Sequence, residues 1–477
     1  MFHRIARFFR RAKTDILIGA MAVLLYALIG FIFYYCMYRT NAYLRHANRT
    51  AGTIILTFVV STVAMRAVYG GYDVGQKKDK PVISAMIFST LITDIITYIQ
   101  FEIMNTNINN RQYLQLFFRN LFSSDLLYLL ICYIVQVLVI ILFVRLGNQL
   151  YFHFTPPQSV LLILGDQDQE ESLRAKIGQY KLQWRVDDAA MFYAPDIKER
   201  IEKADIIFLG NVPFGAKFTL LKLCYDDRKD VMCKAEMEEI MLCNSRPAII
   251  DDAAFLSMKY SKITLLQRII KRLGDVVISL LALILFSPLI LIVSLLIKLE
   301  DGGPVIFKQD RLTLNGRTFT IRKFRTMAPH DESEDDPEVS VAQDDPRITK
   351  IGSFLRRFRL DEIPQFVNIL IGDMSLVGPR PEMMANVTRY KMDLPAFVYR
   401  EKMKAGLTGY AQIEGRYNTT AEDKLMLDLM YIESFSIWVD VKLILRTFTL
   451  LFKKDSTQGF RTSPGSNNID NENEGDR

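Results

Sequence analysis

The chain has 477 residues, of which 50% are hydrophobic and 23% charged, so it is long enough for two or three domains. Its formal net charge of +6 suits anionic partners or an anionic membrane surface, and no RRM, zinc-finger or basic-repeat pattern indicates nucleic acid. The five cysteines form no CxxC pair, which argues against a structural zinc site or a disulfide framework and favours a reducing compartment.

The first third of the chain is predicted to lie in a membrane. Each of its long apolar stretches is near the length of about 20 residues that crosses a bilayer as a helix. The basic start "MFHRIARFFRRAK" predicts a cytoplasmic N-terminus, and four crossings return the chain to the cytoplasm. We therefore predict four transmembrane helices within 1–147, at roughly 16–38, 51–69, 82–104 and 125–146.

Residues 158–255 are predicted to form a small, degenerate Rossmann-like α/β domain. "SVLLILG" (159–165), "ADIIFLG" (204–210) and "PAIID" (247–251) are short apolar runs that end in turns, as buried parallel strands do. A dinucleotide site would need a glycine fingerprint after the first strand, but the sequence there is "GDQDQE", whose acids would repel a pyrophosphate. A structural or regulatory role is favoured over cofactor binding.

A second membrane element is predicted at 275–298. Its apolar stretch Val276–Ile297 is about 33 Å long as a helix, which is enough to span. Pro288 must bend that helix, and Ser287 can supply a hydrogen bond at the break. Basic residues on both flanks place both ends in the cytoplasm. We predict a re-entrant helix–break–helix hairpin; a fifth, kinked crossing is the alternative.

Cationic side chains are concentrated after this hairpin. Arginine binds phosphate oxygens as a bidentate fork and lysine as a point charge, so these residues predict a phosphate-binding face. "GPRP" is a rigid turn that would fix the direction of its arginine, and "KAGLTGYAQIEGR" is glycine-rich. The candidate phosphate ligands are Arg311, Lys323, Arg325, Arg380 and Arg416. The polar tail 454–477 is predicted to be disordered.

The stretch "RLDEIPQF" (359–366) places Asp361 and Glu362 in this cationic field. A carboxylate can act as a phosphoryl-transfer nucleophile and form an aspartyl-phosphate. Mg²⁺ is usually held by one or two carboxylates together with substrate phosphates. The pair is therefore predicted to divide the nucleophile and metal roles between its two members.

From about Lys271 to Phe448 the chain resembles the bacterial sugar transferases, the monotopic polyprenyl-phosphate phosphoglycosyl transferases. The resemblance rests on the order and spacing of several segments: "KRLGDVVIS", "LFSPLI", "GPVIFKQDRL", "KFRTM", "DPRITKIGSFLRRFRLDEIPQFVNIL", "GDMSLVGPRPE", "GLTGYAQIEGR" and "DLMYIESFSIWVDVKLILRTF". The four N-terminal spans and the α/β domain are similar to the large members of the family, which start capsule or exopolysaccharide repeat units.

The resemblance implies a C-terminal α/β catalytic domain (268–453) anchored by a re-entrant helix that breaks at Ser287–Pro288. It implies an Asp-Glu dyad, here Asp361 and Glu362, with Asp361 as the nucleophile, which leaves the predicted role of Mg²⁺ ligand to Glu362. The implied reaction transfers a sugar-1-phosphate from a UDP-sugar to undecaprenyl phosphate and releases UMP, at the cytoplasmic face of the bacterial inner membrane. The expected partners are thus these two substrates and the lipid bilayer; a homodimer is compatible with this reading, and no nucleic acid is expected.

Two positions depart from the family pattern near the expected substrate pocket. Ala405 stands where the family usually has proline, and "RYNTT" (416–420) replaces an Asn-rich run. The identity of the donor sugar therefore stays open. Two rival functions are a non-catalytic membrane scaffold for polysaccharide assembly and a Rossmann-type sugar epimerase, which the missing glycine fingerprint disfavours.

Overall fold

The computed structural model divides the chain into two compact units, Met1–Lys234 and Ala235–Arg477. It describes residues 2–40, 49–75, 77–105, 124–243, 245–258, 263–328, 347–415 and 419–450. Arg416 and the tail 454–477 lie outside these ranges, so the predictions made for them are not tested.

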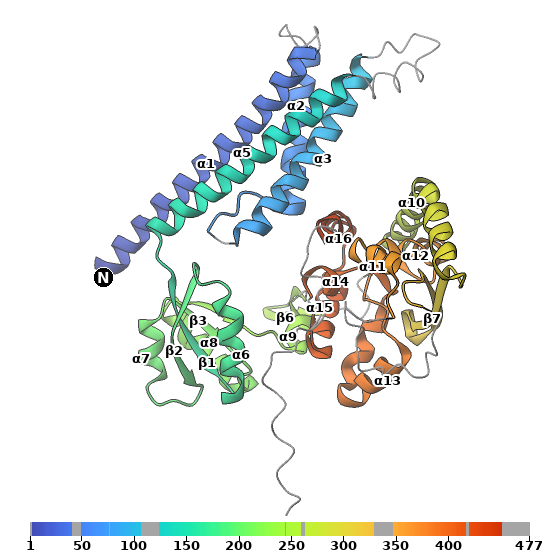
Figure 1. Ribbon diagram of the computed structural model, residues 1–477. Helices are drawn as coiled ribbons and strands as arrows, with labels where there is room; N and C mark the ends of the chain where they lie inside the picture. The colour runs from blue at the N-terminus through green and yellow to red at the C-terminus, as the bar shows by residue number, and fades with distance from the viewer. Residues whose placement is uncertain are drawn as a thin grey trace, which may run out of the picture. The chain divides into compact units, whose positions relative to one another are not determined.

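The first unit begins with long helices that run side by side (Figure 1). They are α1 (Phe2–Thr40), α2 (Arg49–Tyr69), α3 (Asp79–Asn105) and α5 (Ser124–Phe154). Each contains a segment long and apolar enough to cross a membrane, so the prediction of helices at these four apolar stretches is confirmed. Many of their large apolar side chains point outward, as lipid-facing residues do.

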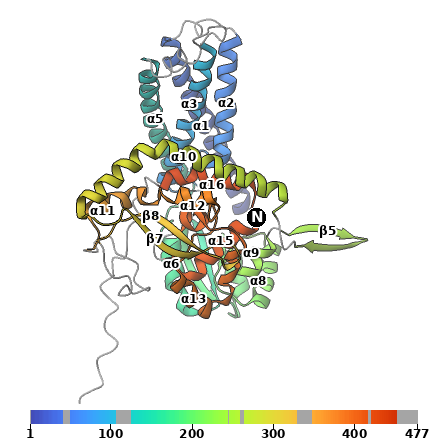
Figure 2. The same cartoon turned by 90° about the vertical axis from the view of Figure 1, so that its right-hand side faces the viewer.

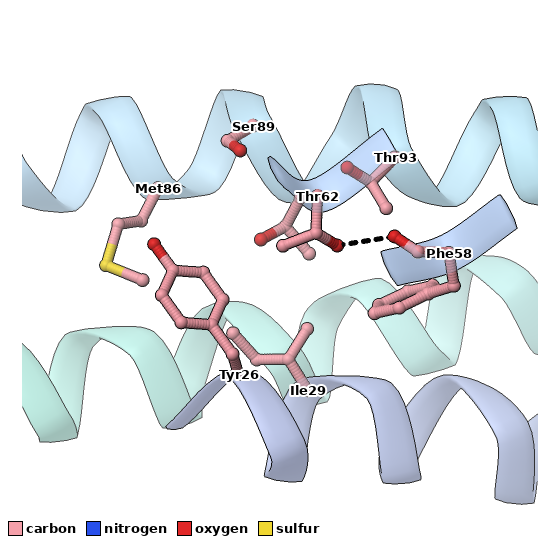
Figure 3. A pocket seen from close by; sticks show the side chains of 8 residues that line it. Tyr26, Ile29, Phe58, Thr62, Met86, Ser89 and Thr93 are labelled. Carbon is pink, nitrogen blue, oxygen red and sulfur yellow. Dashed lines mark hydrogen bonds between the residues drawn. The ribbon is translucent and has the colours of Figure 1, made fainter. Parts of the chain in front are cut away.

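The interior of this helical bundle contains polar side chains. A cavity of about 10 Å³, room for about one water molecule, lies between the hydroxyl-bearing side chains of Tyr26, Thr62, Ser89 and Thr93 (Figure 3). The Thr62 hydroxyl donates to the carbonyl of Phe58 at 2.7 Å. This bond lies within α2 and gives the hydroxyl a partner inside the apolar bundle.

The rest of the first unit is a parallel sheet with the strand order β2-β1-β3-β4. Its strands are β1 (Gln158–Leu164), β2 (Trp184–Met191), β3 (Ile206–Leu209) and β4 (Asp230–Cys233), and its helices are α6 (Glu170–Gly178), α7 (Ile197–Lys203) and α8 (Phe214–Asp226). Two of the three predicted strands, at 159–165 and 204–210, are confirmed as neighbours in this sheet.

The assignment of 247–251 to the parallel sheet is wrong. In the structure β5 (Arg246–Ile250) belongs to the second unit and pairs antiparallel with β6 (Ala253–Ser257). The apolar run is a strand, as its composition indicates, but only two residues separate it from the next apolar run, and so short a connection favours a hairpin over a parallel crossover. The sheet is completed instead by the more polar β4.

The second unit contains α10 (Leu265–Asp301), which has Pro288 inside it. Thr264 caps its start, and Gly302 ends it in the left-handed conformation. Figure 2 shows α10 as an arch; a straight helix projects as a straight rod from any side, so the helix is bent. The Ser287 hydroxyl donates to the carbonyl of Ile284 at 2.7 Å, which is the carbonyl that Pro288 leaves without its helical donor.

Most of the remaining elements of the second unit pack around one core, while α11 and the end of β8 pack against α10 in a second apolar cluster. The strands are β7 (Ile306–Leu312) and β8 (Thr318–Phe324), paired antiparallel, and β9 (Ser375–Val377) and β10 (Gly406–Thr408), paired parallel. The helices are α9 (Met237–Leu242), α11 (Lys350–Arg357), α12 (Gln365–Ile371), α13 (Met384–Asp393), α14 (Tyr410–Glu414), α15 (Ala421–Glu433) and α16 (Ile437–Leu450). Their buried apolar side chains, including Phe397, Leu425, Leu429 and Tyr431, form the main core.

Candidate active site

The carboxylate pair lies on a tight turn between two helices. Asp361 and Glu362 belong to the single 3-10 turn Leu360–Glu362, which follows α11 and precedes α12. Arg359 opens this turn with a left-handed backbone (φ 54°, ψ 24°), a conformation that costs a non-glycine residue about 1–2 kcal/mol. Pro364 caps the start of α12, so it begins a helix and does not break one.

Asn368 fixes α12, and with it the turn, against β8. Its side chain is fully buried, donates to the carbonyl of Thr320 at 2.8 Å and accepts from the backbone N–H of Arg322 at 3.0 Å. Lys323 is the next residue on β8. The backbone of β8 is therefore held in a set position relative to Asp361 and Glu362.

Two cations converge on Glu362. The Lys323 ammonium donates to its Oε1 at 3.2 Å, and the Arg380 guanidinium lies 3.7 Å from the same oxygen. Lys323 comes from β8 and Arg380 from the turn after β9. The structure thus brings together four of the predicted site residues: Asp361, Glu362, Lys323 and Arg380.

These surroundings shift the pKa values of Asp361 and Glu362 in opposite directions. Burial raises the pKa of Asp361 to about 6, with the Glu362 charge adding to the rise and Lys323 opposing it. Burial also acts to raise the pKa of Glu362, but Lys323, Arg380 and Arg359 outweigh it and hold that pKa well below its usual range. At pH 7 Glu362 is ionised, and Asp361 is mostly ionised with a more basic carboxylate, as a nucleophile requires.

Arg311 and Arg325 are directed elsewhere. Arg311 donates to Gln309 Oε1 at 2.5 Å and contacts the Pro381 carbonyl at 3.4 Å, and burial lowers its pKa to about 10. Arg325 is 8% exposed, pairs with Asp301 and donates to a backbone carbonyl. Both guanidinium groups hold parts of the protein together, so their direct contact with a phosphate stays a prediction.

A metal ion at this site would need coordinating atoms from a bound substrate or water in addition to those of the protein. Among the described residues no group of three or more His, Cys, Asp or Glu side chains is arranged to hold a metal ion. The ionised Glu362 beside Asp361 still fits an Mg²⁺ ion that takes its remaining ligands from phosphate oxygens and water.

A buried ion-pair network, whose residues are not among the predicted site residues, lies next to Arg380. Arg400 (5% exposed) pairs with Asp428 (1% exposed) at 2.6 Å, and Lys424 lies 3.3 Å from Glu382. Asp428 is the one acid within the otherwise apolar run "LMLDLMYI", and an isolated acid in such a run is the signal that could have identified it.

A sequence profile described as bacterial sugar transferase matches residues 266–454. The Escherichia coli (strain K12) protein named UDP-glucose:undecaprenyl-phosphate glucose-1-phosphate transferase is 42% identical over 187 residues, which are 38% of this chain and 40% of that protein. A protein of the same name from Caulobacter vibrioides is 43% identical over 192 residues, 39% of this chain and 71% of its own length.

A third relative is the Aeromonas hydrophila UDP-N-acetylgalactosamine-undecaprenyl-phosphate N-acetylgalactosaminephosphotransferase, 42% identical over 182 residues, 37% of this chain and 42% of its own. The chain therefore spans about two-fifths of the Escherichia coli and Aeromonas relatives and most of the Caulobacter one. With the site geometry, these matches place the chain in the bacterial sugar transferase family.

Proposed function

We propose that this protein transfers a sugar-1-phosphate from a UDP-sugar to undecaprenyl phosphate and releases UMP. The relatives are named for reactions of this type. The observation that carries the proposal is the pairing of Asp361, whose pKa burial raises to about 6, with a Glu362 kept ionised by Lys323 and Arg380.

The reaction has two displacement steps at one phosphorus atom. A carboxylate oxygen of Asp361 attacks the sugar-linked phosphate, a new P–O bond forms, and the bond to the UMP oxygen breaks. An oxygen of undecaprenyl phosphate then attacks the same phosphorus and releases the Asp361 carboxylate. The product is a sugar joined to undecaprenyl through a diphosphate, so the phosphoryl group is conserved and no oxidant or reductant is needed.

Lys323 and Arg380 have two roles in this scheme. They keep Glu362 ionised, and Arg380, whose side chain is 44% exposed, can reach substrate phosphate oxygens. Glu362 would be the protein's ligand for Mg²⁺, which when bound supplies charge neutralisation for the phosphates. Electrostatic stabilisation and positioning are the main contributions a protein makes to phosphoryl transfer.

The attachment of α10 supports a re-entrant membrane helix and a cytoplasmic active site. Near its start, Lys271 pairs with Asp440 at 2.6 Å, and Arg272 donates to the carbonyl of Ile369 at 2.7 Å. Near its end, Asp301 pairs with Arg325. A straight helix of 37 residues would separate its ends by about 55 Å. A bent helix with both ends held by one folded unit suits a segment that enters and leaves the membrane on one side.

We propose further that the protein is an inner-membrane enzyme with four N-terminal crossings that performs the first membrane step of capsule or exopolysaccharide repeat-unit synthesis. The rival is a non-catalytic scaffold of the assembly complex. Purified protein incubated with a panel of UDP-sugars and undecaprenyl phosphate decides between them. Release of UMP with one donor, lost in Asp361→Asn, supports the enzyme; no release with any donor from folded protein supports the scaffold.

A further inference from the structure

We propose that Arg400 and Asp428 form a positioning pair that sets the direction of Arg380 toward the carboxylate turn. The inference rests on the proposed function, in which Arg380 serves the phosphates. Neither member of the pair is expected to touch substrate, because both side chains are almost completely buried. Their effect on the reaction would pass through Arg380 alone.

One guanidinium group connects the pair to the turn. Nε and one terminal nitrogen of Arg400 donate to the same oxygen of Asp428, at 3.0 and 2.6 Å. That terminal nitrogen also donates to the backbone carbonyl of Arg380 at 2.7 Å. The other terminal nitrogen lies 3.9 Å from Glu382. Arg400 therefore contacts the turn at two points, the carbonyl of Arg380 and the carboxylate of Glu382.

The turn has little freedom left once these contacts form. Pro379 and Pro381 restrict their own backbone and that of the residue before each of them. The backbone N–H of Gly378 donates to the Thr408 carbonyl, and the N–H of Gly406 donates to the Pro379 carbonyl, both within 2.9 Å. The carbonyl of Arg380 is thus the part of the turn whose position depends on Arg400.

The pair depends on two groups: the guanidinium of Arg400, which donates several hydrogen bonds at once, and the buried carboxylate of Asp428, which accepts two of them. Asp428 is 1% exposed, and burial raises its pKa to about 6 although Arg400 opposes the rise. A buried ion pair with this desolvation cost contributes little net stability but loses its geometry when one partner is changed. Lysine at position 400 would keep the charge without the fork that reaches Asp428 and Arg380 together.

A cavity beside the pair offers space into which the turn can move once the Arg400 contact is lost. Its volume is about 20 Å³, and Pro379, Arg380, Glu382 and Arg400 are among its lining residues. Without the Arg400 contact, the Arg380 carbonyl can shift into this space. A shift of about 1 Å can cost a reaction on the order of 100-fold when it displaces a positioning group.

The test is a double-mutant cycle on UMP release by the full-length protein, with Asp428→Asn, Arg380→Ala and the two combined. We expect Asp428→Asn to lower kcat/KM about 10-fold, Arg380→Ala about 100-fold, and the combination no more than Arg380→Ala alone. Asp373→Asn is the matched control, since Asp373 pairs with Arg317 at 2.9 Å in the same unit. Arg400→Lys serves as the second variant if Asp428→Asn does not fold.

A combined loss of about 1,000-fold, equal to the product of the single losses, would overturn the proposal, because the pair would then act independently of Arg380. So would unchanged kcat/KM in Asp428→Asn or Arg400→Lys. Hydrogen exchange needs no activity: Asp428→Asn, but not Asp373→Asn, should speed exchange of the amides in 378–383. If the wild type releases no UMP while this exchange result holds, the proposed function fails and the positioning pair stands; unchanged exchange overturns the pair.

Discussion

The Nζ atom of Lys323 on β8 lies 3.2 Å from Oε1 of Glu362 and donates a hydrogen bond to it. This ion pair joins β8, a strand that follows α10, to the turn that carries both acids. It also opposes the rise that burial imposes on the pKa of Asp361. Lys323 thus controls the ionisation of a neighbour as well as that of its own partner.

Lys323→Met should shift the pH dependence of the reaction upward. In the proposed mechanism only ionised Asp361 can attack, so the rate should fall as the pH drops through its pKa of about 6. Loss of the ammonium charge raises that pKa further, and the acid limb of the kcat/KM profile should move to higher pH by about one unit. Lys308→Met changes an exposed lysine and should leave the limb in place. An unmoved limb in Lys323→Met would contradict this electrostatic role.

Asp361→Asn should stabilise the protein above pH 6. Folding raises the pKa of Asp361 from its ordinary value of 3.8 to about 6, so the folded state holds this proton more tightly than the unfolded state does. The cost of the carboxylate to folding therefore grows as the pH rises from 3.8 to 6 and is fully present above 6, at about 1.4 kcal/mol for each unit by which the pKa is raised. Asparagine removes that cost.

The measurement is thermal unfolding in detergent at pH 8 and pH 4. The gain in Tm of Asp361→Asn over the wild type should be present at pH 8 and shrink at pH 4, where aspartate is largely protonated in the folded state. Asp310→Asn changes an exposed carboxylate and serves as the control. A gain that grows on acidification would show that burial does not dominate the environment of Asp361.

Arg359→Gly should leave stability unchanged or raise it slightly, because glycine adopts the left-handed backbone without steric cost, a gain of about 1 kcal/mol that offsets the loss of the arginine charge beside Glu362. Arg357→Gly is the matched control: Arg357 lies at the end of α11, where glycine should lower stability by up to about 1 kcal/mol. Chemical denaturation of both variants checks the opposite signs. A loss in Arg359→Gly as large as in Arg357→Gly would contradict the strain at the turn.

Combined replacement of Ser287 by Ala and Pro288 by Leu should give a mixed topology. The variant restores an unbroken apolar helix, and insertion across the bilayer then competes with the basic flank after Lys298 and with the contacts that hold both ends of α10. Thr318→Cys, in a background without the native cysteines, provides an exposed probe. We expect labelling from outside in part of the variant molecules only. Labelling of the parent protein from outside would contradict the re-entrant helix.

The sequence predicts those parts of the structure that depend on local pattern. Hydropathy located the long helices, and Ser287 does make the hydrogen bond expected beside Pro288. The directions of Arg311 and Arg325 could not be predicted, because Pro381 and Asp301 are brought to them by the fold.

The same limit applies to the Arg400–Asp428 pair, whose members are 28 residues apart and meet through the packing of α15. The left-handed backbone of Arg359 also has no local signature, because arginine rarely adopts it. The placement of 247–251 in the parallel sheet was wrong because an apolar run indicates a strand but not the strand with which it pairs.

The most direct test of the account is a search for a covalent intermediate on Asp361. Purified protein is mixed with its UDP-sugar in the absence of undecaprenyl phosphate, and UMP release and intact mass are measured together. We predict release of about one UMP per active site, a mass gain of one sugar-phosphate located at Asp361 by peptide sequencing, and loss of both in Asp361→Asn. Turnover that requires both substrates together and leaves no adduct, or continued turnover in Asp361→Asn, would contradict the account.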